Sequence, residues 1–280
     1  FEAVKGISFK VNRGEIFGFL GPNGAGKTTT VHVLTTLLRL TSGKATVAGH
    51  DVVKEPMEVR KRIGIVFQDP SLDRELTAYE NMYIHGRIYG YEGGWLKRRI
   101  WELLKFVELE KHANRVVKTF SSGMQRRLEI ARALIHQPEI LFLDEPTLGL
   151  DPHTRAHIWE YIKMMKKEYD TTIFLTTHYM DEAEMLCDRI AIIDHGKIIA
   201  IGTPEELKSI VGKEVVYLRL ANNVKECIEA DFIEDCKILP DGSMKLSVKD
   251  ASKVLPEIFE IASRRGWRIL EISYRKPTLN

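Results

Sequence analysis

The sequence predicts an α/β fold with a mainly parallel sheet and a helical subdomain, followed by a small C-terminal α+β module. Up to about residue 211, short apolar segments alternate with helix-like segments, which is the order typical of a parallel sheet. A glycine-rich string, residues 21–30, lies between an apolar strand and a helical pattern. From residue 212 the strand-like segments become closely spaced. We therefore expect a main domain over 1–211 and an accessory domain over 212–280.

The composition is that of a soluble globular protein. Of 280 residues, 44% are hydrophobic and 29% are charged, which excludes a wholly disordered or collagen-like chain. The net charge of +2 includes no basic block, so a strongly basic nucleic-acid binder is not expected. No apolar run approaches the roughly 18 residues that span a bilayer, and no signal peptide is visible. Any membrane role is therefore expected to come through a partner.

The three cysteines, Cys187, Cys227 and Cys236, are odd in number and unrelated in spacing. This predicts neither a disulfide framework nor a zinc site, and it is consistent with a reducing compartment. We interpret the cysteines as small apolar residues. The chain begins at Phe1, inside an alternating pattern and without Met, so we expect a truncated chain.

The first domain is expected to contain strands and helices in alternation. Residues 5–20 alternate and then become continuously apolar, which predicts strands, the last of them buried. Residues 75–135 have mainly helical periodicity, with a glycine-rich break at 90–94, and the helical subdomain is expected over about 70–135. The remaining elements expected here are a helix over 31–40, a strand over 63–67, strands over 140–143, 172–176 and 189–194, and a helix over 153–168.

The second domain is expected to have the order βαββαβ, which suggests a ferredoxin-like module. A turn signal, Pro240-Asp241-Gly242, separates two of its strands. The elements expected are strands over 214–220, 233–239, 243–248 and 267–274, a short helix over 222–231, and a longer helix over 251–265.

Residues 21–28 fit the phosphate-loop pattern G-x-x-x-x-G-K-[ST]. Glycines allow successive backbone N–H groups to turn inward around phosphate oxygens, and the following helix directs its positive end at the anion. Lys27 is expected to reach the β and γ phosphates, and the Thr28 hydroxyl is expected to ligate Mg²⁺. The residues expected to bind the nucleotide here are Gly21, Pro22, Asn23, Gly24, Ala25, Gly26, Lys27, Thr28 and Thr29.

Two carboxylates follow the apolar strand at 140–143. Nucleotide sites of parallel sheets lie at the carboxyl ends of the strands, where Asp144 would hold Mg²⁺ through water. Glu145 would orient or deprotonate the attacking water. The alternative, a solvated strand end that caps a helix, is less favoured beside a phosphate loop.

The string Phe120-Ser121-Ser122-Gly123-Met124, just ahead of these carboxylates, closely resembles the L-S-G-G-Q signature motif of ATP-binding-cassette (ABC) proteins. Over residues 1–211 every catalytic element of that family occurs in order, including Walker A and Walker B. The resemblance implies the fold of a P-loop NTPase cassette, with ATP and Mg²⁺ as cofactors. It also implies roles for Gln68 in catalysis and as a metal ligand, for His178 as the switch histidine, and for Ser121, Gly123 and Asp151 in nucleotide binding.

The drug-export branch of the family, which includes the daunorubicin-resistance type, resembles this chain further. The similar segments are residues 68–73, 76–81 and 179–184. The branch works with a separate membrane subunit, so the resemblance implies a transmembrane permease partner and a peripheral location on the cytoplasmic face of the membrane. It also implies a second ATPase protomer, identical or closely related, whose signature motif faces this chain's Walker A across the nucleotide.

Two departures from the signature are Ser122 at the first glycine position and Met124 at the glutamine position. Because Ser121 and Gly123 are kept, we expect altered affinity and not lost function. The family's adenine-stacking aromatic residue usually lies upstream of the first strand pair. Phe1, 26 residues before Lys27, is expected to lie past that position, so the adenine contact is left unassigned.

Other activities remain as alternatives. A cassette ATPase acting on nucleic acid would typically carry a long coiled coil between Walker A and the signature, and one acting on the ribosome usually carries two cassettes. A non-hydrolysing regulator would be expected to lack Glu145 or His178. The leading interpretation is therefore an exporter ATPase with no nucleic-acid partner. Whether a membrane protein, a ribosome or DNA co-purifies with the chain would discriminate among these activities.

Overall fold

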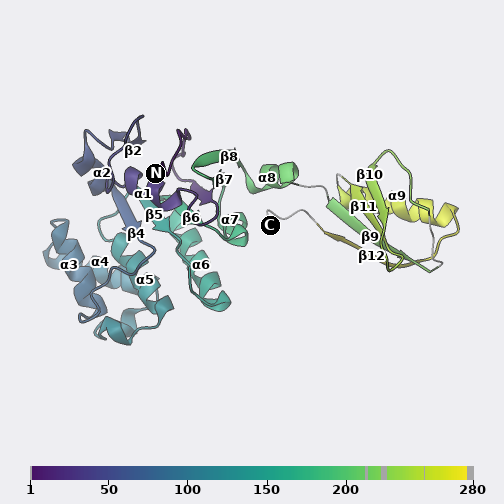
Figure 1. The fold of residues 1–280 in the computed structure, drawn as a ribbon. Helices are drawn as coiled ribbons and strands as arrows, with labels where there is room; N and C mark the ends of the chain where they lie inside the picture. The colour runs from purple at the N-terminus through teal and green to yellow at the C-terminus, as the bar shows by residue number, and fades with distance from the viewer. Residues whose placement is uncertain (1, 212–213, 222–225, 249, 276–280) are drawn as a thin grey trace. The chain divides into compact units, whose positions relative to one another are not determined.

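The computed structural model describes residues 2–211, 214–221, 226–248 and 250–275 (Figure 1). The chain divides into two compact units, Phe1–Pro204 and Glu205–Asn280, each described below by itself. No helix in the described ranges is both long enough and apolar enough to cross a membrane.

A six-stranded sheet in the order β4-β5-β6-β1-β7-β8 forms the centre of the first unit. Its first five strands are parallel, and β8 pairs with β7 in the antiparallel sense. Every residue of β1 and β6 is buried, as expected of parallel strands that helices cover on both faces. The strands are β1 Ile16–Leu20, β4 Ile63–Val66, β5 Ile140–Asp144, β6 Thr172–Thr177, β7 Arg189–Asp194 and β8 Lys197–Gly202.

Helices follow most of these strands and pack on the sheet. Among them, α1 contacts β5, α5 contacts β4, and α7 contacts both β1 and β6. A short hairpin, β2 with β3, precedes α2. The elements are α1 Lys27–Leu34, β2 Thr46–Val47, β3 His50–Asp51, α2 Pro56–Arg62, α5 Ser122–Ala133, α6 Pro152–Tyr169 and α7 Met180–Leu186. The predicted parallel sheet with covering helices is confirmed.

The predicted helical region is confirmed as α3 (Ala78–Ile88), α4 (Gly93–Phe106) and α5, which Figure 1 shows gathered beyond β4. A capping box begins α3, because the Thr77 hydroxyl accepts from the Glu80 backbone N–H and the Glu80 carboxylate accepts from the Thr77 N–H. The apolar face of α4 is buried in this region. Two short 3₁₀ helices, η1 Glu110–His112 and η2 Val117–Thr119, connect α4 to α5.

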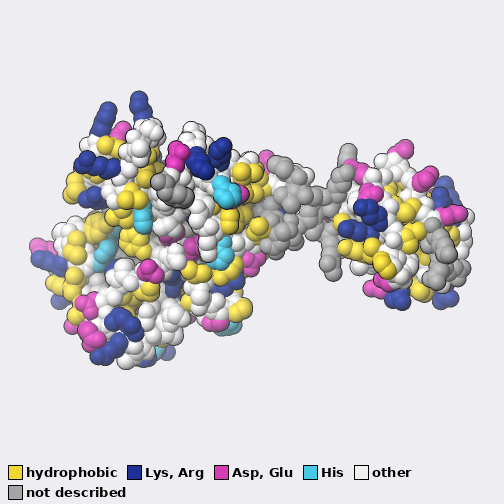
Figure 2. Space-filling view, viewed as in Figure 1, with side chains coloured by type: hydrophobic (Ala, Val, Ile, Leu, Met, Phe, Trp, Pro, Cys, Tyr) yellow, Lys and Arg dark blue, Asp and Glu magenta, His cyan; other side chains and the backbone are white. Residues whose placement is uncertain are grey.

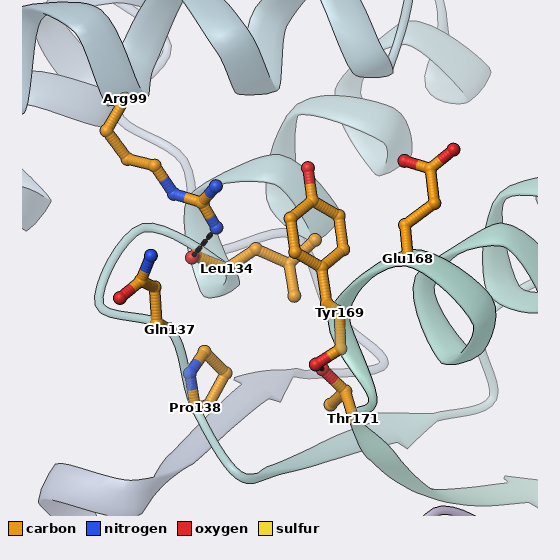
Figure 3. A pocket seen from close by; sticks show the side chains of 7 residues that line it. All are labelled: Arg99, Leu134, Gln137, Pro138, Glu168, Tyr169 and Thr171. Atoms are coloured by element: carbon orange, nitrogen blue, oxygen red, sulfur yellow. Dashed lines mark hydrogen bonds between the residues drawn. The ribbon is translucent and has the colours of Figure 1, made fainter.

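Arg99 of α4 joins the helical region to the rest of the unit (Figure 3). Its Nη2 donates to the Leu134 carbonyl at 3.0 Å, and its guanidinium lies 5.0 Å from the Tyr169 ring centroid. These residues line a cavity of about 260 Å³ with Gln137, Pro138, Glu168 and Thr171. Since Pro138 and Thr171 precede β5 and β6, the cavity lies at the amino ends of these strands, away from the predicted nucleotide site.

Aromatic residues of α3 and its C-terminal turn stack on neighbouring rings of the helical region. Tyr79 stacks on Tyr83 at 6.2 Å between centroids, and Tyr89 stacks on His136 at 3.8 Å. Tyr91 stacks on Trp95 at 4.5 Å. The four tyrosines are half-buried and Trp95 is 36% exposed, so these rings stack at the surface of the helical region and not in its core.

Two expectations for the N-terminal part are wrong. Residues 5–12 contain no strand, because their apolar side chains alternate to pack on the sheet and not to form a ladder. Phe9, for example, stacks on Phe17 with centroids 5.7 Å apart. The helix expected over 31–40 is the end of α1, which begins at Lys27 and stops at Leu34.

The second unit is built around an antiparallel four-stranded sheet in the order β10-β11-β9-β12. Counted from β9, this is the order 2-3-1-4 of a ferredoxin-like module, and it agrees with the predicted α+β class. One face packs α9 through buried Val254 and Ile258 against Val216 and Leu246. The elements are α8 Pro204–Val211, β9 Glu214–Leu220, β10 Ile233–Ile238, β11 Met244–Val248, α9 Ala251–Arg264 and β12 Ile269–Arg275.

The first of the two helices predicted for this unit is absent from the part of its range that the structure describes. Residues 222–225 of the expected helix over 222–231 lie outside the described residues, and residues 226–231 are not helical. The domain boundary predicted between residues 211 and 212 lies at the end of α8. That the residues after it form an accessory domain stays a prediction.

The prediction of no disulfide is wrong for the second unit, where Cys227 is bonded to Cys236. The connection between β9 and β10 brings Cys227 beside Cys236 of β10, with Cα atoms 6.0 Å apart. Spacing along the chain could not show this, because the approach depends on how the connection crosses the sheet. Cys187 is free and buried as expected, and burial raises the pKa of its thiol.

Candidate nucleotide site

Four neighbouring strands deliver the predicted site residues to one edge of the sheet. In the order β4-β5-β6-β1, their carboxyl ends lead to Gln68, to Asp144 and Glu145, to His178, and to the phosphate loop. Parallel strands place such ends together, which is where nucleotide sites of open α/β sheets form. The topology thus gathers residues that are far apart in the sequence.

The phosphate loop is held tightly against β7 and the turn that follows it. A Cβ on Gly21 would lie 2.1 Å from the Ile193 carbonyl oxygen, so no larger residue fits there without a shift of the backbone. The Gly196 N–H donates to the Ala25 carbonyl at 3.0 Å. Gly26 has φ of 104°, which a glycine adopts readily, and it leads into α1.

Lys27 lies at the centre of a buried network. Its Nζ donates to the carbonyls of Gly21 at 2.8 Å and Pro22 at 3.1 Å. The same ammonium lies 3.1 Å from Glu145 Oε1, and both side chains are about 95% buried, with exposed fractions of 5% and 6%. A buried cation held by loop carbonyls and a carboxylate is a site at which a phosphate oxygen would compete for the same ammonium.

Glu145 also contacts His178, the residue predicted to be the switch histidine. His178 Nδ1 lies 2.8 Å from Glu145 Oε2, so the Nδ1–H donates to the carboxylate and Nε2 is at the opposite side of the ring. The backbone of Glu145 is left-handed, with φ of 48°, and its N–H donates to the Thr176 carbonyl and hydroxyl. Such backbone positions occur at functional sites where the surroundings fix them.

Asp144 and Thr28 form an oxygen pair suited to Mg²⁺. Thr28 Oγ1 lies 3.4 Å from Asp144 Oδ1, and the Thr176 hydroxyl donates to the same oxygen. Mg²⁺ prefers oxygen ligands and usually keeps several waters, so a hydroxyl that binds directly can stand beside a carboxylate that binds through water. The oxygen donors of Thr28 and Asp144 therefore fit the predicted metal.

Gln68 follows β4 but is exposed, and its recorded contact is through the backbone: its carbonyl accepts from Arg126 Nη2 at 2.9 Å. Its assignment as a metal ligand stays a prediction.

Ser121, Gly123 and Thr154 line a hollow that neither Lys27 nor Glu145 lines, and Asp151 contacts the same Thr154. Ser121 caps α5, since its hydroxyl accepts from Met124 N–H at 3.3 Å. A Cβ on Gly123 would lie 2.5 Å from Thr154 Cγ2. The Asp151 carboxylate caps α6 by accepting from the N–H and hydroxyl of Thr154, which lowers the pKa of Asp151.

Sequence reasoning missed a buried carboxylate that joins α7 to α6 and to the segment after β5. Glu182 of α7 is fully buried, and its Oε1 accepts from the Thr147 hydroxyl at 2.7 Å and from Trp159 Nε1 at 2.8 Å. Thr147 lies two residues after Glu145, and Glu182 lies four after His178. The acidic run at 181–184 contained the residue, but only the fold distinguishes its buried member from the exposed Asp181.

We expect Glu182→Gln to flatten the pH dependence of unfolding. Burial raises the pKa of Glu182 above its ordinary value of 4.5. Its contribution to folding is therefore fully present below the unfolded-state pKa and is lost as pH rises through the folded-state pKa. Glutamine keeps an oxygen acceptor and does not ionise. Thermal unfolding of both proteins from pH 4.5 to 8 should favour the variant progressively as pH rises, whereas parallel curves would contradict the expectation.

Comparison with known proteins shows the family of this chain. The sequence profile described as ABC transporter matches residues 4–148. The chain is 48% identical over 218 residues to the daunorubicin/doxorubicin resistance ATP-binding protein DrrA of Streptomyces peucetius, covering 78% of this chain and 66% of that protein, just under two thirds of its length. It is 39% identical over 283 residues to the linearmycin resistance ATP-binding protein LnrL of Bacillus subtilis, covering 99% and 90%.

A solved structure of the same kind is similar in fold. The ATP-binding cassette MJ0796, in a dimeric post-hydrolysis state bound to ADP and Pi, matches with a TM-score of 0.65 and 31% identity over 72% of this chain and 90% of that one. The resemblance to the drug-export type, drawn from the signature and its neighbouring motifs, is confirmed by these relatives. The chain belongs to the ABC transporter family.

Proposed function

We propose that this chain is the ATP-binding and ATP-hydrolysing subunit of an ABC exporter of drugs or other hydrophobic compounds. It would work from the cytoplasmic face of the membrane through a separate transmembrane subunit. The observation that carries the proposal is the convergence of Lys27, Asp144, Glu145 and His178 at one sheet edge. The names of the relatives, which are resistance ATP-binding proteins, support the exporter class.

The geometry supports a division of roles among these residues. The loop N–H groups and Lys27 would bind the phosphates, and Thr28 and Asp144, with Gln68, would hold Mg²⁺. When bound, Mg²⁺ supplies positive charge against the phosphate oxygens. Glu145 would orient and deprotonate the attacking water, and His178 would steady that carboxylate while its Nε2 faces the γ-phosphate.

The second half of the site would come from another protomer. Ser121 and Gly123 line a hollow that Lys27 does not line, so they and Asp151 would serve the nucleotide of a second copy or a close paralogue. The dimeric state named for MJ0796 supports this arrangement. Ser122 and Met124 lie in the first turn of α5, where they would change the affinity of this contact.

The alternative of a cassette ATPase acting on nucleic acid or the ribosome has weaker support. Figure 2 shows Lys and Arg side chains interspersed with Asp and Glu on the face drawn, where a phosphate backbone would favour a basic stripe. No nucleic-acid partner is therefore proposed.

Co-purification with assay of phosphate release tests this function. Expressed with a candidate transmembrane subunit, the chain should co-purify with that subunit and release phosphate from Mg-ATP. Co-purification with ribosomes or DNA instead, with ATPase activity dependent on them, would support the alternative.

The second unit is proposed to be an accessory module outside the catalytic machinery. The proposed site residues end at His178, before this unit begins. A chain that ends at residue 211 should therefore stay folded and keep ATP binding within about threefold, a small change in binding free energy. Circular dichroism and equilibrium ATP binding measure both properties, and an insoluble or non-binding truncation would show that the module is integral to the core.

A further inference from the structure

Helix α5 links two segments to which the proposed function gives different tasks. Its first turn carries the signature residues Ser121 and Gly123. One face of its remaining length contacts residues 67–71, the loop that contains Gln68. Arg126, Glu129 and Arg132 make these contacts, and we call the three residues the loop clamp.

Arg126 binds two successive backbone carbonyls. Its Nη1 donates to the Phe67 oxygen at 2.6 Å, and its Nη2 donates to the Gln68 oxygen at 2.9 Å. A guanidinium is a planar fork of donors, so it fixes the direction of both peptide groups, which the single charged centre of lysine cannot do.

Glu129 and Arg132 hold the far end of the loop. Glu129 Oε1 accepts from the Ser71 N–H at 2.7 Å, while its Oε2 lies 3.1 Å from Arg126 Nη1. Arg132 Nη1 donates to the Ser71 carbonyl at 2.7 Å, and its Nη2 contacts the Ser71 hydroxyl. The loop is thereby held from Phe67 to Ser71 by one helix.

The Arg126–Glu129 pair is buried, with exposed fractions of 6% and 2%. Desolvation lowers the pKa of Arg126 and raises that of Glu129. Burying such a pair carries a desolvation cost that an apolar pair would avoid, so it is weak evidence for a role in stability alone. Its hydrogen bonds to backbone groups of residues 67, 68 and 71 instead indicate that the pair fixes the conformation of the loop.

We infer that the loop clamp makes the Gln68 loop and the signature motif move as one body, and that Arg126, Glu129 and Arg132 are positioning residues for ATP hydrolysis. The inference rests on the proposed function, in which Gln68 serves the chain's own nucleotide and the signature serves the partner's. The clamp would then link occupancy of one site to the geometry offered to the other.

The test compares Arg126→Lys with Arg127→Lys as a matched control. Lysine at 126 keeps the charge beside Glu129 but loses the fork to two carbonyls. Arg127 is the next residue of α5, and its Nη1 donates to the Val107 carbonyl, not to the loop. The double variant Arg126→Met/Glu129→Gln removes both charges together, which avoids an unpaired buried charge if Arg126→Lys fails to fold.

ATP affinity should stay within about twofold for Arg126→Lys, while kcat falls about tenfold and cooperativity in ATP is lost, within the usual range for coupling between sites. Arg127→Lys should match wild type in all three. Unchanged kcat and cooperativity in both the single and the double variant would overturn the inference.

Hydrogen exchange of the nucleotide-free chain gives an answer that does not depend on ATP. In Arg126→Lys, amides of residues 67–71 and of residues 121–125 should both exchange about tenfold faster, as local opening of one unit predicts. Faster exchange in the loop alone would contradict a common body. Wild type that neither binds nor hydrolyses ATP would refute the proposed function, and the exchange result would still decide the mechanical claim.

Discussion

Glu145→Gln should slow phosphate release by roughly 10²–10⁴-fold, the range for a positioned acid–base group. Glu145 Oε1 lies 3.1 Å from Lys27 Nζ, and Oε2 lies 2.8 Å from His178 Nδ1. Glutamine keeps the size of the side chain and its ability to hydrogen-bond. It removes the negative charge and the basic lone pair that the attacking water needs.

A phosphate-release assay measures this effect, and equilibrium binding should show that ATP affinity is retained. Glu75→Gln is a matched control, since it makes the same change on an exposed residue whose recorded partner is Lys118. The control should hydrolyse ATP as wild type does. Near-normal turnover in Glu145→Gln would remove this carboxylate from the proposed catalytic role.

Lys27→Ala should weaken ATP binding by roughly 10²-fold or more, because charge-assisted hydrogen bonds to phosphate are worth about 1.5–3 kcal/mol each. The Lys27 side chain is 5% exposed and is held by two loop carbonyls, so its ammonium is directed into the site. The substitution also leaves Glu145 without the ammonium that pairs with its Oε1. Thermal unfolding should therefore be measured beside binding.

Calorimetric or fluorescence titration with Mg-ATP measures the affinity. Lys61→Ala is the control, since it removes an exposed lysine that pairs with Glu58 on α2. The control should bind as wild type does. Equal affinity of Lys27→Ala and wild type, with both folded, would refute the assignment of the phosphate loop.

The sequence was sufficient to predict that the motifs at strand ends lie close together. Apolar strands that lead into a glycine-rich string, into Asp144-Glu145 and into His178 imply a common edge once the sheet is parallel. The sheet order then brings them together. Local pattern also predicted α6, α9 and the buried β1, because each has a helical period or a continuous apolar run.

Contacts that depend on three-dimensional approach could not be predicted in the same way. The Cys227–Cys236 bond, the Thr176 contact with Asp144 and the grip of Arg126 on the Gln68 loop all join segments without a local pattern. Alternation at residues 7–11 predicted a strand because packing on a sheet and pairing within one give the same period. Arg126 and Arg127 are adjacent in α5 and look alike in the sequence. Only the fold shows that Arg126 is the one that forms a buried pair with Glu129.

Light scattering of Glu145→Gln, with and without Mg-ATP, tests most directly whether ATP at the Lys27–Glu145 site closes two protomers. Without hydrolysis the closed state should accumulate, so the mass should change from that of one 32.1 kDa chain to twice that value on addition of Mg-ATP. Wild type should show less of the dimer. A Glu145→Gln protein that binds ATP and hydrolyses it slowly, yet keeps the monomer mass, would contradict a site shared between two copies of this chain.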